Sequence, residues 1–131
     1  MAATSDFLVR LAFVGIGAMA GAMLRFVLQS VVYSGSSPWL PILGINLTGC
    51  FIIGVLWVML NYFSAPAWLV ALLMPGLLGG FTTFSSFSLD FIALIRDSRL
   101  CTAALYWSAS AVAGPLLCAL GYWLTSKTLD L

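Results

Sequence analysis

The chain has 131 residues, of which 63% are hydrophobic and only 7% are charged. Soluble domains carry about 25% charged residues, so this composition excludes an ordinary soluble domain and indicates an integral membrane protein. The chain contains no histidine, and its formal net charge is +1. It lacks the acid–base pairs of most hydrolytic enzymes and the basic stripe of a nucleic-acid-binding protein. We therefore expect lipid as its surroundings, no enzymatic activity and no nucleic-acid partner.

A membrane-spanning helix needs about 20 mostly apolar residues, and four stretches of the sequence fit. We expect them at about residues 7–32, 40–62, 67–95 and 101–125. Turn residues at 34–38, a short loop at 61–66 and a charged tip at 96–99 separate these spans. No connection is long enough for a further domain. The sequence therefore predicts an all-α membrane protein with a single transmembrane domain over residues 1–131.

The first span carries Gly17 and Gly21, which are four positions apart. This small-xxx-small spacing allows helix backbones to approach closely in membranes. We expect helix packing at these glycines, either within one chain or between two chains.

The centre of the third span is unusual for a membrane helix, because it holds Pro75 and the glycines Gly76, Gly79 and Gly80. Proline removes a backbone hydrogen bond, and glycine adds conformational freedom. In lipid, each backbone group freed in this way needs another partner, such as protein, water or an ion. We therefore expect the third helix to be broken near Pro75–Gly80.

Directly after this segment, residues 81–88 place five hydroxyl side chains among three phenylalanines. On a helix, Phe84 and Phe87 form one stripe, while Thr82, Ser85 and Ser86 lie on the adjoining face. A helix that faces only lipid has no need of five hydroxyls, although Ser and Thr can also bond back to their own helix. A polar track beside aromatic rings suits a small ion that moves in single file.

The side chains around this track favour an anion. No carboxylate flanks the track, so a cation would lack its usual attractant, whereas hydroxyl hydrogens and the positive edges of aromatic rings can face an anion. Asn46 could donate its amide hydrogens to an anion, or it could make a helix–helix hydrogen bond. For Arg25 we expect contact with the membrane interface or with backbone carbonyls in preference to contact with the ion.

Three segments together resemble the Fluc/CrcB family of fluoride channels: residues 21–25 with Arg25, residues 44–49 with Asn46, and residues 79–88, GGFTTFSSFS. The resemblance covers all four spans. It implies a fluoride-selective channel that exports fluoride passively across the plasma membrane, here the bacterial inner membrane, for fluoride resistance. It also implies a dual-topology homodimer of two antiparallel subunits, with two narrow pores and a structural sodium ion at the dimer centre.

The resemblance also implies roles for individual residues. The residues that would line the fluoride pore by this resemblance are Phe84, Phe87, Asn46, Tyr106 and Ser110, and the hydroxyl track adds Ser85 and Ser86. Arg25 matches the first-helix arginine of the family and would have a structural or vestibule role. The backbone carbonyls of Gly79 and Thr82 match the sodium ligands, two from each subunit. Gly114 stands where a further hydroxyl is expected, and Asp90 stands where relatives tend to have glutamate.

The distribution of positive charges favours insertion in both orientations. We expect Arg10 and Lys127 on one side of the membrane, and Arg25, Arg96 and Arg99 on the other. Two positive side chains against three is a small difference, so the positive-inside rule gives little preference for either orientation.

The alternative is a small multidrug-type proton antiporter, which is also a four-helix protein that forms dual-topology dimers. Such an antiporter needs a titratable carboxylate within the membrane, and Asp90 is the only candidate deep enough. A subunit that only packs against partner proteins is a third possibility, but packing alone would be served by Leu, Ala and Gly.

Overall fold

The computed structural model describes residues 2–32 and 37–131. Within these ranges the chain forms helices and no strand, and four helical stretches are long and apolar enough to cross a membrane. They are Thr4–Val32, Leu40–Tyr62, Ala67–Arg96 and Leu100–Thr128. The all-α membrane fold is therefore confirmed, with spans that extend at most three residues beyond the predicted limits. Most of the predicted turn at 34–38 lies outside the described residues.

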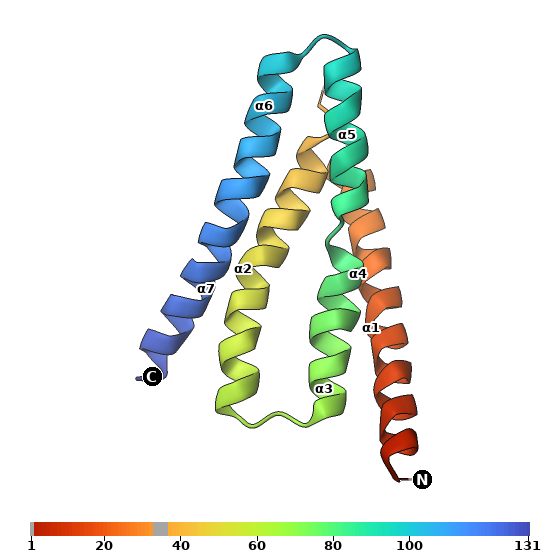
Figure 1. The fold of residues 1–131 in the computed structure, drawn as a ribbon, viewed down its shortest axis with the longest axis vertical. Helices are drawn as coiled ribbons and strands as arrows, with labels where there is room; N and C mark the ends of the chain where they lie inside the picture. The colour runs from red at the N-terminus through yellow and green to blue at the C-terminus, as the bar shows by residue number, and fades with distance from the viewer. Residues whose placement is uncertain (1, 33–36) are drawn as a thin grey trace.

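The four spans run alternately up and down the bundle (Figure 1). The first is α1 (Ala2–Val32) and the second is α2 (Leu40–Tyr62). The third comprises α3 (Ala67–Ala71), η1 (Leu72–Leu78), α4 (Gly79–Phe81) and α5 (Phe84–Arg96), and the fourth comprises α6 (Leu100–Ser108), η2 (Ala109–Ala113) and α7 (Gly114–Thr128). Helix α1 packs along the lower half of the third span, and α2 packs along α7. The α5–α6 hairpin closes the upper end, and both chain ends lie toward the lower end.

Glycines bring α1 and the third span into close contact. A Cβ atom at Gly17 would collide with the carbonyl oxygen of Leu72, and one at Gly21 would collide with that of Leu77. Gly80 approaches the backbone of Ala18 in the same way from the opposite helix. The small-xxx-small contact of the first span therefore lies within one chain.

Two segments of the spans have widened, π-helical turns. The first, η1, contains Pro75, and the second, η2, ends just before Pro115. A proline ring clashes with the carbonyl four residues earlier and offers no N–H, and a wider turn relieves both problems. The sequence predicts the distortion at Pro75 but not the second one in the fourth span.

The third helix is interrupted at Thr82 and Thr83, both of which have extended backbone angles. The widened segment, Leu72–Leu78, overlaps the predicted window of Pro75–Gly80, and the helix ends at Phe81, one residue beyond that window. Threonine is suited to this position because its branched side chain tolerates extended backbone and its hydroxyl can cap a helix. Indeed, the Thr83 side chain accepts a hydrogen bond from the Ser86 N–H at the start of α5.

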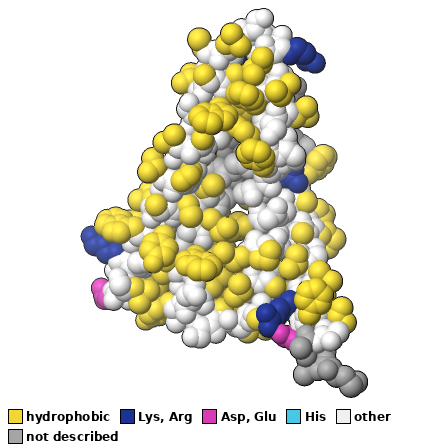
Figure 2. All heavy atoms as spheres, viewed as in Figure 1, with side chains coloured by type: hydrophobic (Ala, Val, Ile, Leu, Met, Phe, Trp, Pro, Cys, Tyr) yellow, Lys and Arg dark blue, Asp and Glu magenta, His cyan; other side chains and the backbone are white. Residues whose placement is uncertain are grey.

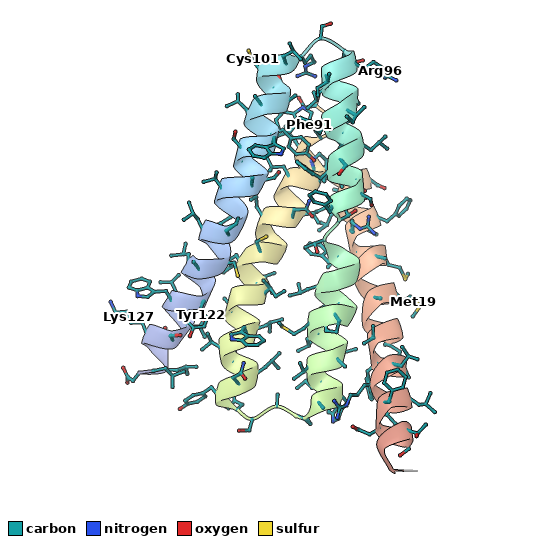
Figure 3. The ribbon with its side chains drawn as sticks, in the orientation of Figure 1. Met19, Phe91, Arg96, Cys101, Tyr122 and Lys127 are labelled. Carbon is teal, nitrogen blue, oxygen red and sulfur yellow. The ribbon has the colours of Figure 1, made fainter. Side chains whose placement is uncertain are left out.

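The buried core of the single chain is small. One cluster near the upper end contains Ile42, Phe87, Leu94, Ala103 and Tyr106, and a second near the middle contains Ile45, Leu78 and Phe81. Many large apolar side chains cover the outside instead (Figure 2), and Figure 3 shows Met19 pointing away from the bundle. Such a surface is suited to lipid or to another membrane-embedded chain.

Candidate functional site

The break in the third span is held by a side chain from α2. The Asn46 Nδ2 group donates to the Thr83 carbonyl at 3.0 Å, and the Asn46 Oδ1 atom accepts from the Thr83 N–H at 2.8 Å. Both backbone groups of an extended residue are thereby satisfied within the membrane. Of the two possibilities left open by the sequence, the helix–helix hydrogen bond is present. One of the two amide hydrogens of Asn46 is not needed for it.

Two backbone carbonyls at the break lose their usual helical donors. In a continuous helix, the Gly79 carbonyl would accept from the Thr83 N–H, which is bonded to Asn46 instead. The Thr82 carbonyl would accept from the Ser86 N–H, which is bonded to the Thr83 hydroxyl instead. These are the two carbonyls that the family resemblance implies as sodium ligands.

Arg25 reaches the same break from α1. Its Nε atom donates to the Gly80 carbonyl at 3.2 Å, and Gly80 lies about halfway along the span Ala67–Arg96. The expected contact of Arg25 with a backbone carbonyl is therefore confirmed, and it places Arg25 deeper along the bundle than Arg96 and Arg99. The freed Gly80 carbonyl explains its position, because a guanidinium group can satisfy that oxygen at a depth where water is scarce.

The five hydroxyls of residues 81–88 divide into two groups. Thr82 and Ser88 donate back to their own helical segments, to the carbonyls of Leu78 and Phe84. The remaining three form a cluster at the start of α5, in which the Thr83 hydroxyl lies 3.1 Å from that of Ser85 and 3.2 Å from that of Ser86. A polar cluster thus lies at the N-terminal, partially positive end of α5.

A line of aromatic rings runs along the upper half of the bundle. The ring centroids are 5.4 Å apart for Phe84 and Phe87, 4.9 Å for Phe87 and Tyr106, and 5.4 Å for Tyr106 and Trp39. Phe87 is 7% exposed, whereas Phe84 is 79% exposed. Phe87 therefore belongs to the core of the single chain, and Phe84 has little packing role within it.

A cavity of about 570 Å³ lies between α2, the break and the fourth span, and the molecular surface is hollowed at mid-height (Figure 2). Its lining brings together predicted site residues from three spans: Asn46, Gly79, Thr82, Phe84, Phe87 and Ser110. Four other predicted residues are not part of the lining: Arg25, Ser85, Ser86 and Tyr106. No charged side chain lines this cavity.

The positions of the two predicted residues in the fourth span differ. Tyr106 is 1% exposed, and its hydroxyl donates to Asp90 Oδ2 at 3.4 Å. Ser110 lines the cavity, and its buried hydroxyl has no hydrogen-bond partner among the described residues. Gly114, the position where a further hydroxyl is expected, is buried, and a Cβ atom there would contact the Cys50 sulfur at 3.4 Å.

Other residues of the lining were not predicted from the sequence. They include Gly49, Cys50, Ile53, Met74, Leu78 and Trp107. Helical spacing could have indicated three of them, because Gly49, Cys50 and Ile53 follow Asn46 by three, four and seven positions and so share its helix face. These residues carry no distinctive chemistry, and only the fold shows which helix faces meet.

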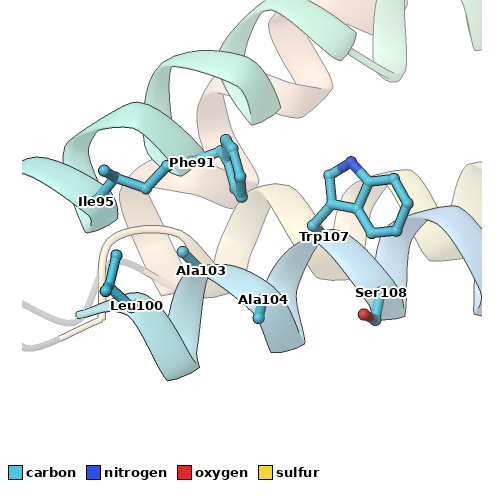
Figure 4. Close-up of a pocket in the computed structure, with 7 residues that line it drawn as sticks. All are labelled: Phe91, Ile95, Leu100, Ala103, Ala104, Trp107 and Ser108. Atoms are coloured by element: carbon cyan, nitrogen blue, oxygen red, sulfur yellow. The ribbon is translucent and has the colours of Figure 1, made fainter.

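A second groove, of about 330 Å³, lies between α5 and α6 and includes Phe91 and Trp107 (Figure 4). The rest of its lining comprises Ile95, Leu100, Ala103, Ala104 and Ser108. Ser108 has the only hydroxyl of this lining, whereas Asn46, Thr82, Thr83 and Ser110 all line the cavity at the break. The groove therefore offers fewer polar partners to an ion than the cavity does. We therefore place the candidate site at the break.

Comparison with known proteins identifies relatives over most of the chain. Residues 12–122 match the family model described as CrcB-like protein, Camphor Resistance (CrcB). A protein of Methylobacillus flagellatus is 38% identical over 122 residues, which cover 89% of this chain and 94% of that protein. A Pseudomonas putida protein is 40% identical over 88% of this chain and 95% of its own length. A Salinibacter ruber protein is 34% identical over 87% of both. All three relatives are named fluoride-specific ion channel FluC.

Proposed function

This chain belongs to the CrcB family, and on that premise we propose that it is a fluoride-specific channel that lets fluoride leave the cell passively. It is a multi-pass protein of the plasma membrane. The observation that carries the proposal is the uncharged cavity beside the interrupted third span, lined by Phe84, Phe87 and polar groups. Membership in a family of ion channels agrees with the expectation that the chain is not an enzyme and gives the proton antiporter no support.

The chemistry of the site favours an anion over a cation. The Ser110 hydroxyl and the spare amide hydrogen of Asn46 can donate to an anion in the cavity, and the N-terminal end of α5 adds positive partial charge. The rims of Phe84 and Phe87 carry the positive edge of the ring quadrupole. Asp90 is not part of the lining and is engaged by Tyr106. Removing the hydration shell of a small anion is costly, and these donors together would offset that cost.

Passive conduction is sufficient for export. In acidic surroundings fluoride enters a cell as the neutral weak acid, dissociates in the neutral interior and is trapped as the anion. An inside-negative potential of 100 mV drives a monovalent anion outward with about 2.3 kcal/mol. An open path for fluoride therefore lowers its internal concentration without any coupled ion.

The proposal includes assembly as an antiparallel homodimer. In one chain Phe84 is 79% exposed and Gly79 is exposed at the break, so the candidate pore is open on one side. A second copy would cover these groups. With Arg25 bonded at the break, the two ends of the bundle carry two positive side chains each. Arg10 in the first turns of α1 and Lys127 near the end of α7 lie toward the lower end, and Arg96 and Arg99 lie at the turn between α5 and α6 at the upper end. This balance supports insertion in both orientations.

We also propose a structural sodium ion at the dimer centre. The Gly79 and Thr82 carbonyls have lost their helical donors, and unwound carbonyls of this kind are suitable ligands for sodium in membrane proteins. Two subunits would supply four such oxygens. When bound, the ion would be coordinated by these carbonyl oxygens and would add positive potential near the anion path.

The decisive experiment is fluoride efflux from liposomes that contain only the purified protein, followed with a fluoride-selective electrode. We expect rapid efflux when a potassium ionophore balances the charge, with no requirement for a proton gradient. Efflux that requires an opposing proton gradient would favour an antiporter. Absence of efflux at a protein density that gives several dimers per liposome would refute the proposed function.

A further inference from the structure

Among the described residues, two buried side-chain nitrogen or oxygen atoms have no hydrogen-bond partner: Trp39 Nε1 and Ser110 Oγ. Buried polar groups in proteins are nearly always paired, and in a membrane the unpaired state is especially unfavourable. Both residues are neighbours of Tyr106. Trp39 packs its ring against the Tyr106 ring, and Ser110 follows Tyr106 by one helical turn. Each of these unpaired donors can donate to a partner from outside the described residues.

The two donors occupy different parts of the molecule. Ser110 lines the cavity at the break, at mid-depth. Trp39 caps the start of α2 at the upper end of the bundle, where the span begins. Its side chain extends the aromatic line from Phe84 through Phe87 and Tyr106 toward the membrane surface.

The Tyr106 hydroxyl is not available to donate a hydrogen bond to an ion near Trp39. Its hydroxyl hydrogen is directed to Asp90 Oδ2, so it is engaged within the chain. The indole N–H of Trp39 is unpaired and is a pure donor, with no lone pair to offer a cation. A group that fits this N–H must therefore accept a hydrogen bond, as fluoride does.

We propose that the Trp39 indole N–H is a fluoride ligand between the membrane surface and the Phe87 ring, an additional site that the ion occupies on its way to or from the cavity. This proposal rests on the proposed fluoride channel. A carbonyl of a second copy would satisfy the same N–H as a purely structural partner, and the two possibilities differ in their response to fluoride.

The test combines ion flux with NMR of protein labelled with ¹⁵N-tryptophan, in which the chain's five tryptophans give five indole N–H signals. Trp39→Phe keeps an aromatic ring, removes the N–H and assigns the Trp39 signal. Trp57→Phe is the matched control, because Trp57 lies on the same helix but is 55% exposed near its far end. If Trp39→Phe does not fold, the four other Trp→Phe variants assign the signal by elimination.

We expect sodium fluoride, compared with sodium chloride at equal concentration, to shift the Trp39 signal saturably and to leave the Trp57 signal in place. We expect Trp39→Phe to lower fluoride flux at least tenfold with the dimer intact, and Trp57→Phe to change it less than twofold. A Trp39 signal that does not move with fluoride while the wild-type protein conducts it would overturn this inference alone. A wild-type protein that passes no fluoride would overturn the proposed function and this inference with it.

Discussion

The side chain of Asn46 and the backbone of Thr83 are joined by two hydrogen bonds, of 3.0 Å and 2.8 Å, between α2 and the break in the third span. An amide side chain has the same donor and acceptor pair as a peptide group, so Asn46 replaces the helical partners that Thr83 has lost. The break and the start of α5 are thereby fixed relative to α2. Phe84, the next residue, takes its position from this pairing.

We predict that Asn46→Ala destabilises the fold and stops conduction. The change leaves the Thr83 N–H and carbonyl without partners, at about 1–3 kcal/mol for each group. Asn46→Asp should also fail, because a carboxylate can accept from the N–H but repels the carbonyl. Thermal unfolding in detergent and fluoride efflux measure the two effects. Asn61→Ala is the control, since Asn61 is exposed and its side chain donates to the Trp57 carbonyl of its own helix. Equal losses in both alanine variants would contradict the prediction.

The two phenylalanines should differ in their effect on stability and agree in their effect on flux. Phe87→Ile removes a ring that is 7% exposed and should cost about 1–3 kcal/mol, whereas Phe84→Ile changes a ring that is 79% exposed in one chain and should cost less than about 0.5 kcal/mol. Both variants should reduce fluoride flux severely while they still purify as dimers. Unfolding of the single chain in denaturing detergent and liposome efflux separate the effects. Normal flux in both variants at matched protein density would leave the rings as packing groups only.

Alanine should be tolerated at Gly15 and not at Gly21, although both lie on α1. A Cβ atom at Gly21 meets the Leu77 carbonyl, and such overpacking costs about 1–3 kcal/mol. Nothing lies within 4 Å of a Cβ atom at Gly15, so alanine there should stabilise the helix by up to about 1 kcal/mol. Denaturant unfolding of both variants tests this contrast. Equal free energies of unfolding in the two variants would contradict the close contact between α1 and η1.

One added charge should separate the two orientations. Thr128→Lys adds a positive charge at the lower end and Cys101→Lys adds one at the upper end, where both residues are exposed. The native chain has two positive side chains at each end of the bundle, so one added lysine should make each variant insert mainly in one orientation. Cells that express either variant alone should then lose fluoride efflux. Expression of both variants together should restore efflux through antiparallel pairs. Full efflux from each variant alone, with uniform orientation shown by protease accessibility of a terminal tag, would contradict antiparallel assembly.

The sequence by itself determined the class of protein and the limits of its spans, because a bilayer demands about 20 apolar residues for each crossing and few charges. It also indicated which span is irregular, since Pro75 and its neighbouring glycines act on the backbone locally. Only the tertiary structure decided where the helix stops. Thr83 can leave the helix because Asn46, 37 positions earlier, supplies its hydrogen bonds, and Arg25 lies at mid-depth because Gly80 has a free carbonyl. In lipid no water replaces a missing partner, so the position of a break depends on donors and acceptors that folding brings from other helices.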